Sequence, residues 1–157
     1  MQLDPRGISN FTGNTSFFVE SLSGQNNSLV GDYEVFVANA ANAGVACVQR
    51  EVSIEVTTID DVCRERHITP AFIKIDIEGA ELEALQGMEQ TLQSVHPVVL
   101  LEISRQHHAC WLLLKAAGYV AYDELLRPVA DSEFAAEKQW PGPVNYFFVP
   151  KSHRAAL

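Results

Sequence analysis

Three charged side chains alternate with three isoleucines near the middle of the chain, within the segment AFIKIDIEGAELEAL. The charged residues are Lys74, Asp76 and Glu78. Because a strand points successive side chains to opposite faces, these three residues share one face of a predicted strand. At a rise of ~3.3 Å per residue, neighbouring charged groups stand about 6.6 Å apart. Carboxylates in such a row are able to bind a ligand or to take a proton from one.

The end of this strand is the place where the charged row meets an opening. Charges on one face of a buried strand are costly unless they pair or reach solvent, and Gly79 permits a sharp turn into a following helix. We therefore expect Asp76 to face a ligand. Glu81 is expected chiefly to stabilise the N-terminus of the helix. Two roles stay open for Lys74, a functional cation and a partner that holds Asp76 in place.

Glu102 ends the next apolar run, VVLLEI, and would lie beside Asp76 if the two strands are adjacent. Clustered carboxylates raise one another's pKa values, so Glu102 is a candidate proton acceptor. The alternative, a carboxylate satisfied by the backbone N–H groups that follow it, is equally open. His107 and His108 come next, and a proton-accepting role for His107 is the less favoured hypothesis, since a surface histidine is usually inert.

The elements that must position these residues alternate between strand and helix. The apolar periodicity predicts strands over 52–57, 72–77, 98–103, 119–122 and 144–149, and helices from 59 to before Pro70, over 80–95 and over about 107–117. Thr58 and Asp61 resemble a capping box at the start of the first helix. This order favours a doubly wound α/β sheet, and the run over 98–103 favours a strand covered on both faces. Ligands bind outside the carboxyl ends of the strands in such sheets, which selects residues 76–79 and 102–108.

The chain of 157 residues is expected to form one domain, with an irregular segment over 1–47, an α/β core over 48–150 and a loose tail over 151–157. Short apolar groups at 17–19 and 35–37 leave strands and loop both open within the first segment. The three cysteines have no CxxC spacing, so we expect neither disulfides nor zinc, and we expect Cys63 and Cys110 to be core fillers.

The net charge of −9 argues against nucleic acid and an anionic membrane as partners, because both need a basic face. The sequence shows no leader and no apolar run of ~20 residues, so a cytoplasmic location is expected. P-loop, GxSxG and HExxH motifs are absent from the sequence, and no glycine-rich turn follows a predicted strand.

Four segments in order, TTIDDVCRERHI, FIKIDIEGAELEALQGM, HPVVLLEI and LLKAAGY, resemble the FkbM family of S-adenosylmethionine-dependent methyltransferases over about residues 52–149. The resemblance implies a partial Rossmann-like methyltransferase sheet whose last strand, over 144–149, is antiparallel. It also implies methyl transfer from S-adenosylmethionine to a hydroxyl of a small molecule or sugar. Asp76 and Glu78 would border the methyl group and the acceptor, Lys74 and Asp76 would contact the cofactor, and Glu102 or His107 would take the hydroxyl proton.

The family's D-x-G-A-x-x-G cofactor turn, and the acidic residue that ends its next strand, are not found in this sequence. The resemblance therefore covers the rear part of the family's domain. We expect a fragment or truncated product without methyl transfer by this chain alone. A missing central strand would leave a sheet edge open to self-association. The competing hypothesis is a non-catalytic α/β module that binds a partner through that edge.

Overall fold

The structure is a computed structural model of the chain, and it describes residues 2–20, 27–29, 49–103, 105–137, 139 and 144–156. The strands are β1 (Gly7–Ile8), β2 (Gly13–Glu20), β3 (Gln49–Thr57), β4 (Phe72–Ile75), β5 (Val98–Ile103), β6 (Tyr119–Tyr122) and β7 (Val144–Pro150). The α-helices are α2 (Ile59–Arg66), α3 (Glu81–Gln86), α4 (Glu89–Ser94) and α5 (His107–Ala116), with 3₁₀ helices η1 (Asp131–Phe134) and η2 (Lys151–Ala156). None of the helices in these ranges is long and apolar enough to cross a membrane.

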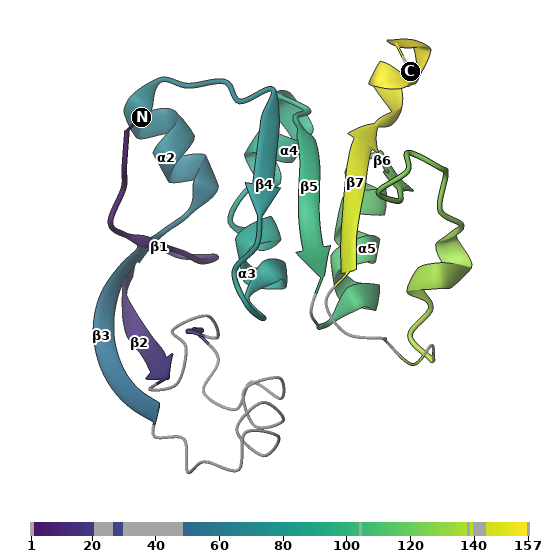
Figure 1. Cartoon of the computed structure of the whole chain (residues 1–157). Coiled ribbons are helices and arrows are strands. Elements are labelled where there is room, and N and C mark those ends of the chain that lie inside the picture. Colours follow the sequence, from purple (N-terminus) through teal and green to yellow (C-terminus); the bar gives the residue numbers. More distant parts are fainter. Residues whose placement is uncertain are drawn as a thin grey trace.

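The strands form two separate mixed sheets, which Figure 1 shows beside each other. The first has the order β1-β3-β2, with β1 parallel and β2 antiparallel to β3. The second has the order β4-β5-β7-β6, with β4 parallel to β5 and β7 antiparallel to both of its neighbours. The protein is therefore an α/β protein, and the prediction of an antiparallel last strand is confirmed.

Helices α3, α4 and α5 lie on one face of the four-stranded sheet, behind the strands in Figure 1. In β5 the side chains of Val99, Leu101 and Ile103 are fully buried against these helices, whereas Val98 and Leu100 are only half-buried. Burying each large apolar side chain contributes about 1.5–3 kcal/mol. The prediction of a β5 strand covered on both faces is wrong for the described residues, because they place helices on one face only. A doubly wound sheet is likewise not found among them.

The helix predicted over 80–95 is broken into α3 and α4 at Gly87 and Met88. Asp60, at the start of α2, caps the second piece: its carboxylate accepts hydrogen bonds from the N–H groups of Gln90 at 3.0 Å and Thr91 at 2.8 Å. Because a cap from a distant segment begins a new helix here, the prediction of one continuous helix from the apolar periodicity over 80–95 is wrong.

Strand β3 ends at Thr57, as its alternating pattern predicts, but it begins at Gln49, earlier than predicted. It pairs with β1 and β2 instead of joining the four-stranded sheet. The segment 1–47, expected to be irregular, thus supplies two strands, and the apolar group 17–19 lies in β2. The group 35–37 and Cys47 lie outside the described residues. The tail, expected to be loose, forms η2 over 151–156.

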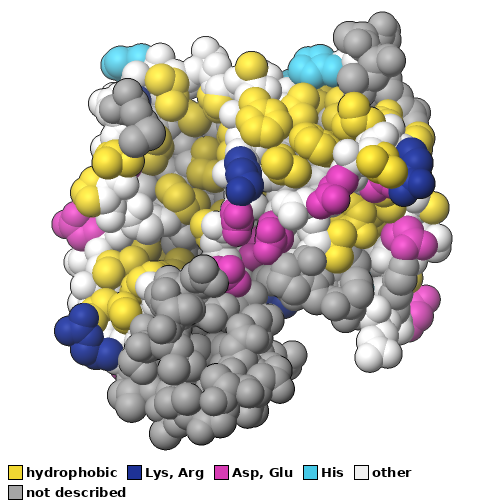
Figure 2. Space-filling model, viewed as in Figure 1, with side chains coloured by type: hydrophobic (Ala, Val, Ile, Leu, Met, Phe, Trp, Pro, Cys, Tyr) yellow, Lys and Arg dark blue, Asp and Glu magenta, His cyan; other side chains and the backbone are white. Residues whose placement is uncertain are grey.

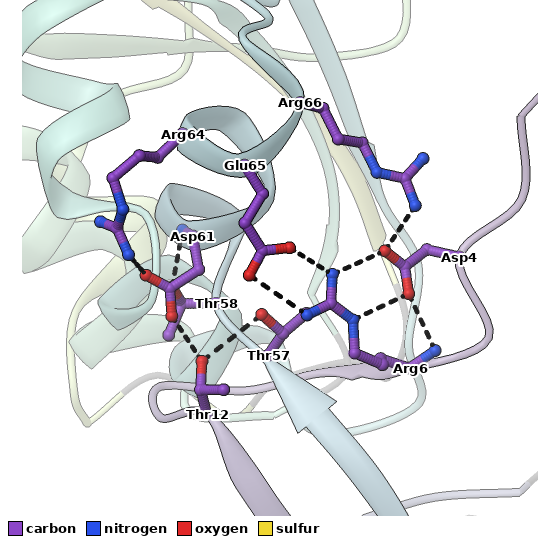
Figure 3. Close-up of polar contacts among 9 residues, drawn as sticks. All are labelled: Asp4, Arg6, Thr12, Thr57, Thr58, Asp61, Arg64, Glu65 and Arg66. Carbon is purple, nitrogen blue, oxygen red and sulfur yellow. Dashed lines mark hydrogen bonds and ion pairs between the residues drawn. The ribbon is translucent and has the colours of Figure 1, made fainter.

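Polar contacts fasten the N-terminal segment to α2 (Figure 3). The guanidinium of Arg6 bridges Asp4 and Glu65, with Nη2 at 2.9 Å from Asp4 Oδ2 and 2.8 Å from Glu65 Oε2. Arg66 reaches the same Asp4 oxygen at 2.6 Å. A second set joins Thr12, Thr57, Thr58, Asp61 and Arg64. Within it the Asp61 N–H donates to Thr58 Oγ1 at 3.0 Å, which confirms the predicted helix cap.

Candidate active site

The carboxyl ends of β4 and β5 bring Asp76 and Glu102 together. Ile75 is the partner of Leu101 in the parallel register, so the next residue of each strand lies at the same level. Both side chains belong to the face that α3, α4 and α5 leave open. Figure 2 shows acidic side chains gathered below a basic one near the centre of this face. The predicted adjacency of the two carboxylates is confirmed.

Lys74 forms an ion pair with Asp76, with 2.8 Å between Nζ and Oδ2. The pair is open to solvent, since 54% of the Lys74 side chain and 39% of the Asp76 side chain are exposed. The hydrogen bond to Asp76 raises the pKa of Lys74, and the carboxylate of Glu102 adds to the effect. Of the two roles left open for Lys74, the geometry shows the partner that holds Asp76.

Glu102 is held from the other side by Asn145, its register partner on β7, whose Nδ2 donates to Oε2 at 3.3 Å. Asn145 was not predicted from the sequence. Its only signal is that it is the one amide in the apolar segment VNYFFV. Which strand pairs with β5 depends on the order of strands in the sheet, and the residue pattern of a single strand does not encode that order.

Glu78 does not continue the charged row, so this part of the prediction is wrong. Strand β4 ends at Ile75, and Glu78 lies in a turn with a positive φ of 52°. Its backbone carbonyl accepts a hydrogen bond from the hydroxyl of Ser28. The turn redirects Glu78 away from strand geometry, and its site role stays a prediction.

Glu81 has the structural role expected of it. The residue is buried, with 1% of its surface exposed, and Oε1 accepts the N–H of Gly79 at 2.7 Å. Gly79 itself has a positive φ of 97°, a conformation that glycine adopts without steric cost. The Glu81 carboxylate therefore fixes the turn that carries the chain from β4 into α3.

The two histidines that follow β5 fasten α5 to the segment around η1. His107 Nε2 lies 3.0 Å from the carbonyl oxygen of Ala135, and His108 Nδ1 lies 2.9 Å from that of Phe134. Phe134 is fully buried and stacks on Trp111 of α5, with 5.0 Å between ring centroids. The histidine contacts therefore support a packed layer. A proton-accepting role for His107 stays a prediction.

A small apolar cavity of about 190 Å³ lies between the first sheet and the turn after β4. Side chains of the first sheet line one side and Ile77 and Ala80 line the other, with Asn27 as a polar contributor. Ile77, which directly follows Asp76 in the chain, is the lining residue of this cavity that lies nearest in sequence to the acidic residues of the site. Among the described residues, no group of histidine, cysteine, aspartate or glutamate side chains is arranged to hold a metal ion.

The candidate site contains two neighbouring carboxylates and one lysine near the carboxyl ends of the parallel strands β4 and β5, and one amide at the start of the antiparallel strand β7. Such groups are suited to binding hydroxyls and positive charge and to accepting a proton. Ligand sites of α/β proteins commonly lie at such strand ends, so these residues form the candidate site of this chain. The family model described as the methyltransferase FkbM domain matches residues 5–121. The chain belongs to the FkbM methyltransferase family. Searches of the curated proteins and of the solved structures give no significant match.

Proposed function

We propose that this protein carries the acceptor side of an S-adenosylmethionine-dependent O-methyltransferase site, with a small-molecule or sugar hydroxyl as the acceptor. The observation that carries the proposal is the contact of Lys74 with Asp76 and of Glu102 with Asn145, where β4 and β5 end and β7 begins, in a chain of a methyltransferase family.

The described residues suit this cofactor in charge and in shape. Asp76 and Glu102 place negative charge where a cationic sulfur and ribose hydroxyls are to be bound. The cavity lined by Ile77, about 190 Å³ in volume, is below the ~300–1,000 Å³ of whole ligand pockets, so it takes only one apolar part of such a molecule. When bound, S-adenosylmethionine supplies a methyl group on a positively charged sulfur, and the methyl–sulfur bond breaks as the acceptor oxygen attacks.

Residues of the chain itself accept the proton of the acceptor hydroxyl and position the acceptor. Glu102 takes the proton of the acceptor hydroxyl as that oxygen bonds to the methyl carbon, and the Asn145 amide holds the carboxylate in position. Asp76 accepts a hydrogen bond from a second hydroxyl and fixes the acceptor's orientation. Lys74 keeps Asp76 ionised and aimed at the site. Positioning dominates, because methyl transfer needs the oxygen in line with the methyl–sulfur bond.

The test is a titration of the chain with S-adenosylhomocysteine, followed by NMR shifts of isoleucine methyl groups. We expect saturable shifts at Ile77, which lines the cavity and directly follows Asp76 in the chain. Asp76→Asn should weaken binding at least about fivefold, the loss of one charge-assisted hydrogen bond. The matched control is Asp131→Asn, a carboxylate that pairs with Lys115 elsewhere on the surface and should leave binding unchanged.

Two results would contradict the proposal. If millimolar S-adenosylhomocysteine produces no shifts, the chain does not bind this cofactor product, and the hypothesis of a non-catalytic module is favoured. Equal weakening by Asp76→Asn and Asp131→Asn would mean that general charge, rather than this site, attracts the ligand.

A further inference from the structure

The cavity of about 190 Å³ lies where the first sheet meets the turn after β4, and all three strands of the first sheet line it. None of the described lining side chains carries a charge, and Asn27 is the one polar side chain among them. Phe17 of β2 contributes an aromatic ring to the wall. The cavity therefore suits an uncharged and mainly apolar ligand, because burying a charge there without a partner is costly.

Hydrogen bonds join the two sides of the cavity, so its shape exists before a ligand binds. Ser28 pairs with Phe18 of β2 through two backbone hydrogen bonds of 2.9 and 3.1 Å. Its hydroxyl donates to the carbonyl of Glu78 at 2.5 Å, in the turn after β4. Asn27 and Leu29, the neighbours of Ser28 in the chain, both line the cavity. A ligand that enters such a preformed site loses little free energy to ordering the protein.

Two small residues help to keep this space open. A Cβ added at Gly7 would stand 3.0 Å from Cδ1 of Ile54 and 3.2 Å from Cγ1 of Val56. On the other side of the cavity, Ala80 is buried, with 1% of its surface exposed. Because both small residues line the cavity, larger side chains at these positions would reduce its volume or displace their neighbours.

We propose that this cavity binds a single uncharged aromatic ring system. An apolar cavity of ~150 Å³ lined by leucine, isoleucine and phenylalanine is large enough to bind benzene. The present cavity of about 190 Å³ has lining of the same kind, so it admits one ring with a small addition. Phe17 favours an aromatic ligand over a saturated one, because paired aromatic rings attract each other beyond the effect of their buried area.

Two kinds of molecule carry such a ring, the cofactor with its adenine base and a free aromatic molecule separate from the cofactor. Assigning the ring to the cofactor rests on the proposed function. The ring site itself rests on the cavity alone. Separate probes therefore distinguish the two sources: adenosine stands for the cofactor's base, and toluene stands for a free aromatic molecule.

The first measurement is a titration with each probe, and with cyclohexane as the saturated counterpart of toluene, followed by NMR of the isoleucine δ methyl groups. Ile8, Ile54 and Ile77 line the cavity, so we expect toluene to shift these three methyl groups saturably. Ile68 and Ile103 do not line it and should stay unshifted. Shifts of the same three groups by adenosine assign the ring to the cofactor, and a response to toluene alone assigns it to a free aromatic molecule.

Two variants test the walls of the cavity. Phe17→Leu removes the aromatic ring but keeps an apolar side chain, so it should weaken toluene binding about two- to tenfold and change cyclohexane binding less. Phe11→Leu replaces a half-exposed ring outside the lining and should change neither. Ala80→Val adds two carbon atoms to the wall and should weaken toluene binding at least about tenfold, with unchanged circular dichroism. Ala116→Val makes the same change on the exposed side of α5 and is its control.

The proposal is overturned if neither toluene nor adenosine shifts the three lining isoleucines. It is also overturned if Phe17→Leu weakens toluene and cyclohexane equally, or if Ala80→Val folds and leaves toluene binding unaltered. Asp76-dependent binding of S-adenosylhomocysteine, in a chain that binds neither ring probe, would contradict the ring site and leave the proposed methyl transfer standing. Toluene binding without S-adenosylhomocysteine binding would support the ring site and contradict the proposed function.

Discussion

Gly87 and Ser9 lie in close backbone contact, although 78 positions separate them in the sequence. A Cβ added at Gly87 would overlap the Ser9 carbonyl oxygen and stand 3.2 Å from its carbonyl carbon. Neither atom is able to rotate away, because both belong to the backbone next to β1. The glycine of the LQG sequence is therefore required by packing, since its φ of −77° is open to any residue.

We expect Gly87→Ala to lower the free energy of unfolding by about 2–3 kcal/mol, the usual cost of overpacking a close contact. Urea denaturation followed by circular dichroism measures the change. The matched control is Gly13→Ala, where the new Cβ meets only the ring of Phe11 at 3.4 Å, an ordinary contact distance. Similar losses in the two variants would show that Ser9 and Gly87 are not in contact in solution.

The ion pairs of Arg6 with Asp4 and Glu65 predict that the free energy of unfolding depends on pH in the acid range. Hydrogen bonds from Arg6 hold the pKa of Asp4 and the pKa of Glu65 below their ordinary values. A carboxyl whose pKa is lower in the folded state adds stability above its unfolded pKa, and this is lost as pH falls through the folded pKa. We expect the free energy of unfolding to fall from about pH 5 to about pH 2.

Arg6→Gln should lower stability at neutral pH and make this fall shallower, because the two carboxyls then titrate nearer their ordinary values. Urea denaturation at a series of pH values measures both effects. Arg105→Gln removes a charge outside the bridge and should leave the slope unchanged. An unaltered slope in Arg6→Gln would show that the bridge does not form.

Asp60 should be the most costly helix cap to lose. Its carboxylate accepts the N–H groups of Gln90 and Thr91, and also the Thr91 hydroxyl at 2.6 Å. Asp60→Ala leaves that buried hydroxyl without its acceptor, so we expect a loss of about 1–2 kcal/mol in thermal or urea unfolding. Asp60→Asn keeps one acceptor oxygen and should lose less. Equal losses in both variants would contradict the cap.

The hydroxyl of Tyr119 is fully buried and has no hydrogen-bond partner among the described residues. Removing it in Tyr119→Phe should leave stability unchanged or raise it by about 1 kcal/mol. Burial raises the pKa of Tyr119 from 10.0 to about 12, so the folded state holds its proton longer than the unfolded state. Stability is then lost as pH rises between these two values.

Comparing the two proteins from pH 9 to 12 isolates this group, because Cys110, whose pKa burial also raises to about 12, is present in both. The variant should lose less stability in that range. A loss of more than about 1 kcal/mol in Tyr119→Phe at neutral pH would show that the hydroxyl has a partner.

Local pattern was enough to predict most of the elements. The alternation in β3 and the cap at Thr58 are encoded within a few neighbouring residues. The adjacency of Asp76 and Glu102 also followed from local signals, because two successive parallel strands end at the same edge of a sheet.

The failures share a physical cause, contact with residues distant in the sequence. Gly87 reads as a tolerated helix residue until Ser9 packs on it, and Asp60 begins α4 from another helix. Strand β2, GNTSFFVE, carries little apolar alternation, so its pairing with β3 was invisible. Asn145 joins the site only through the antiparallel register of β7 with β5.

The hydrogen bonds of Asp60 also provide a way to measure how firmly α2 and the first sheet stay attached to α3 and α4. It donates its own N–H to the Gly87 carbonyl at 3.0 Å while its carboxylate holds the N–H groups of Gln90 and Thr91. Those two amide protons are shielded from solvent deuterium only while α2 stays docked. Their exchange rates therefore report the opening of the joint between the N-terminal sheet and the helical layer, separately from global unfolding.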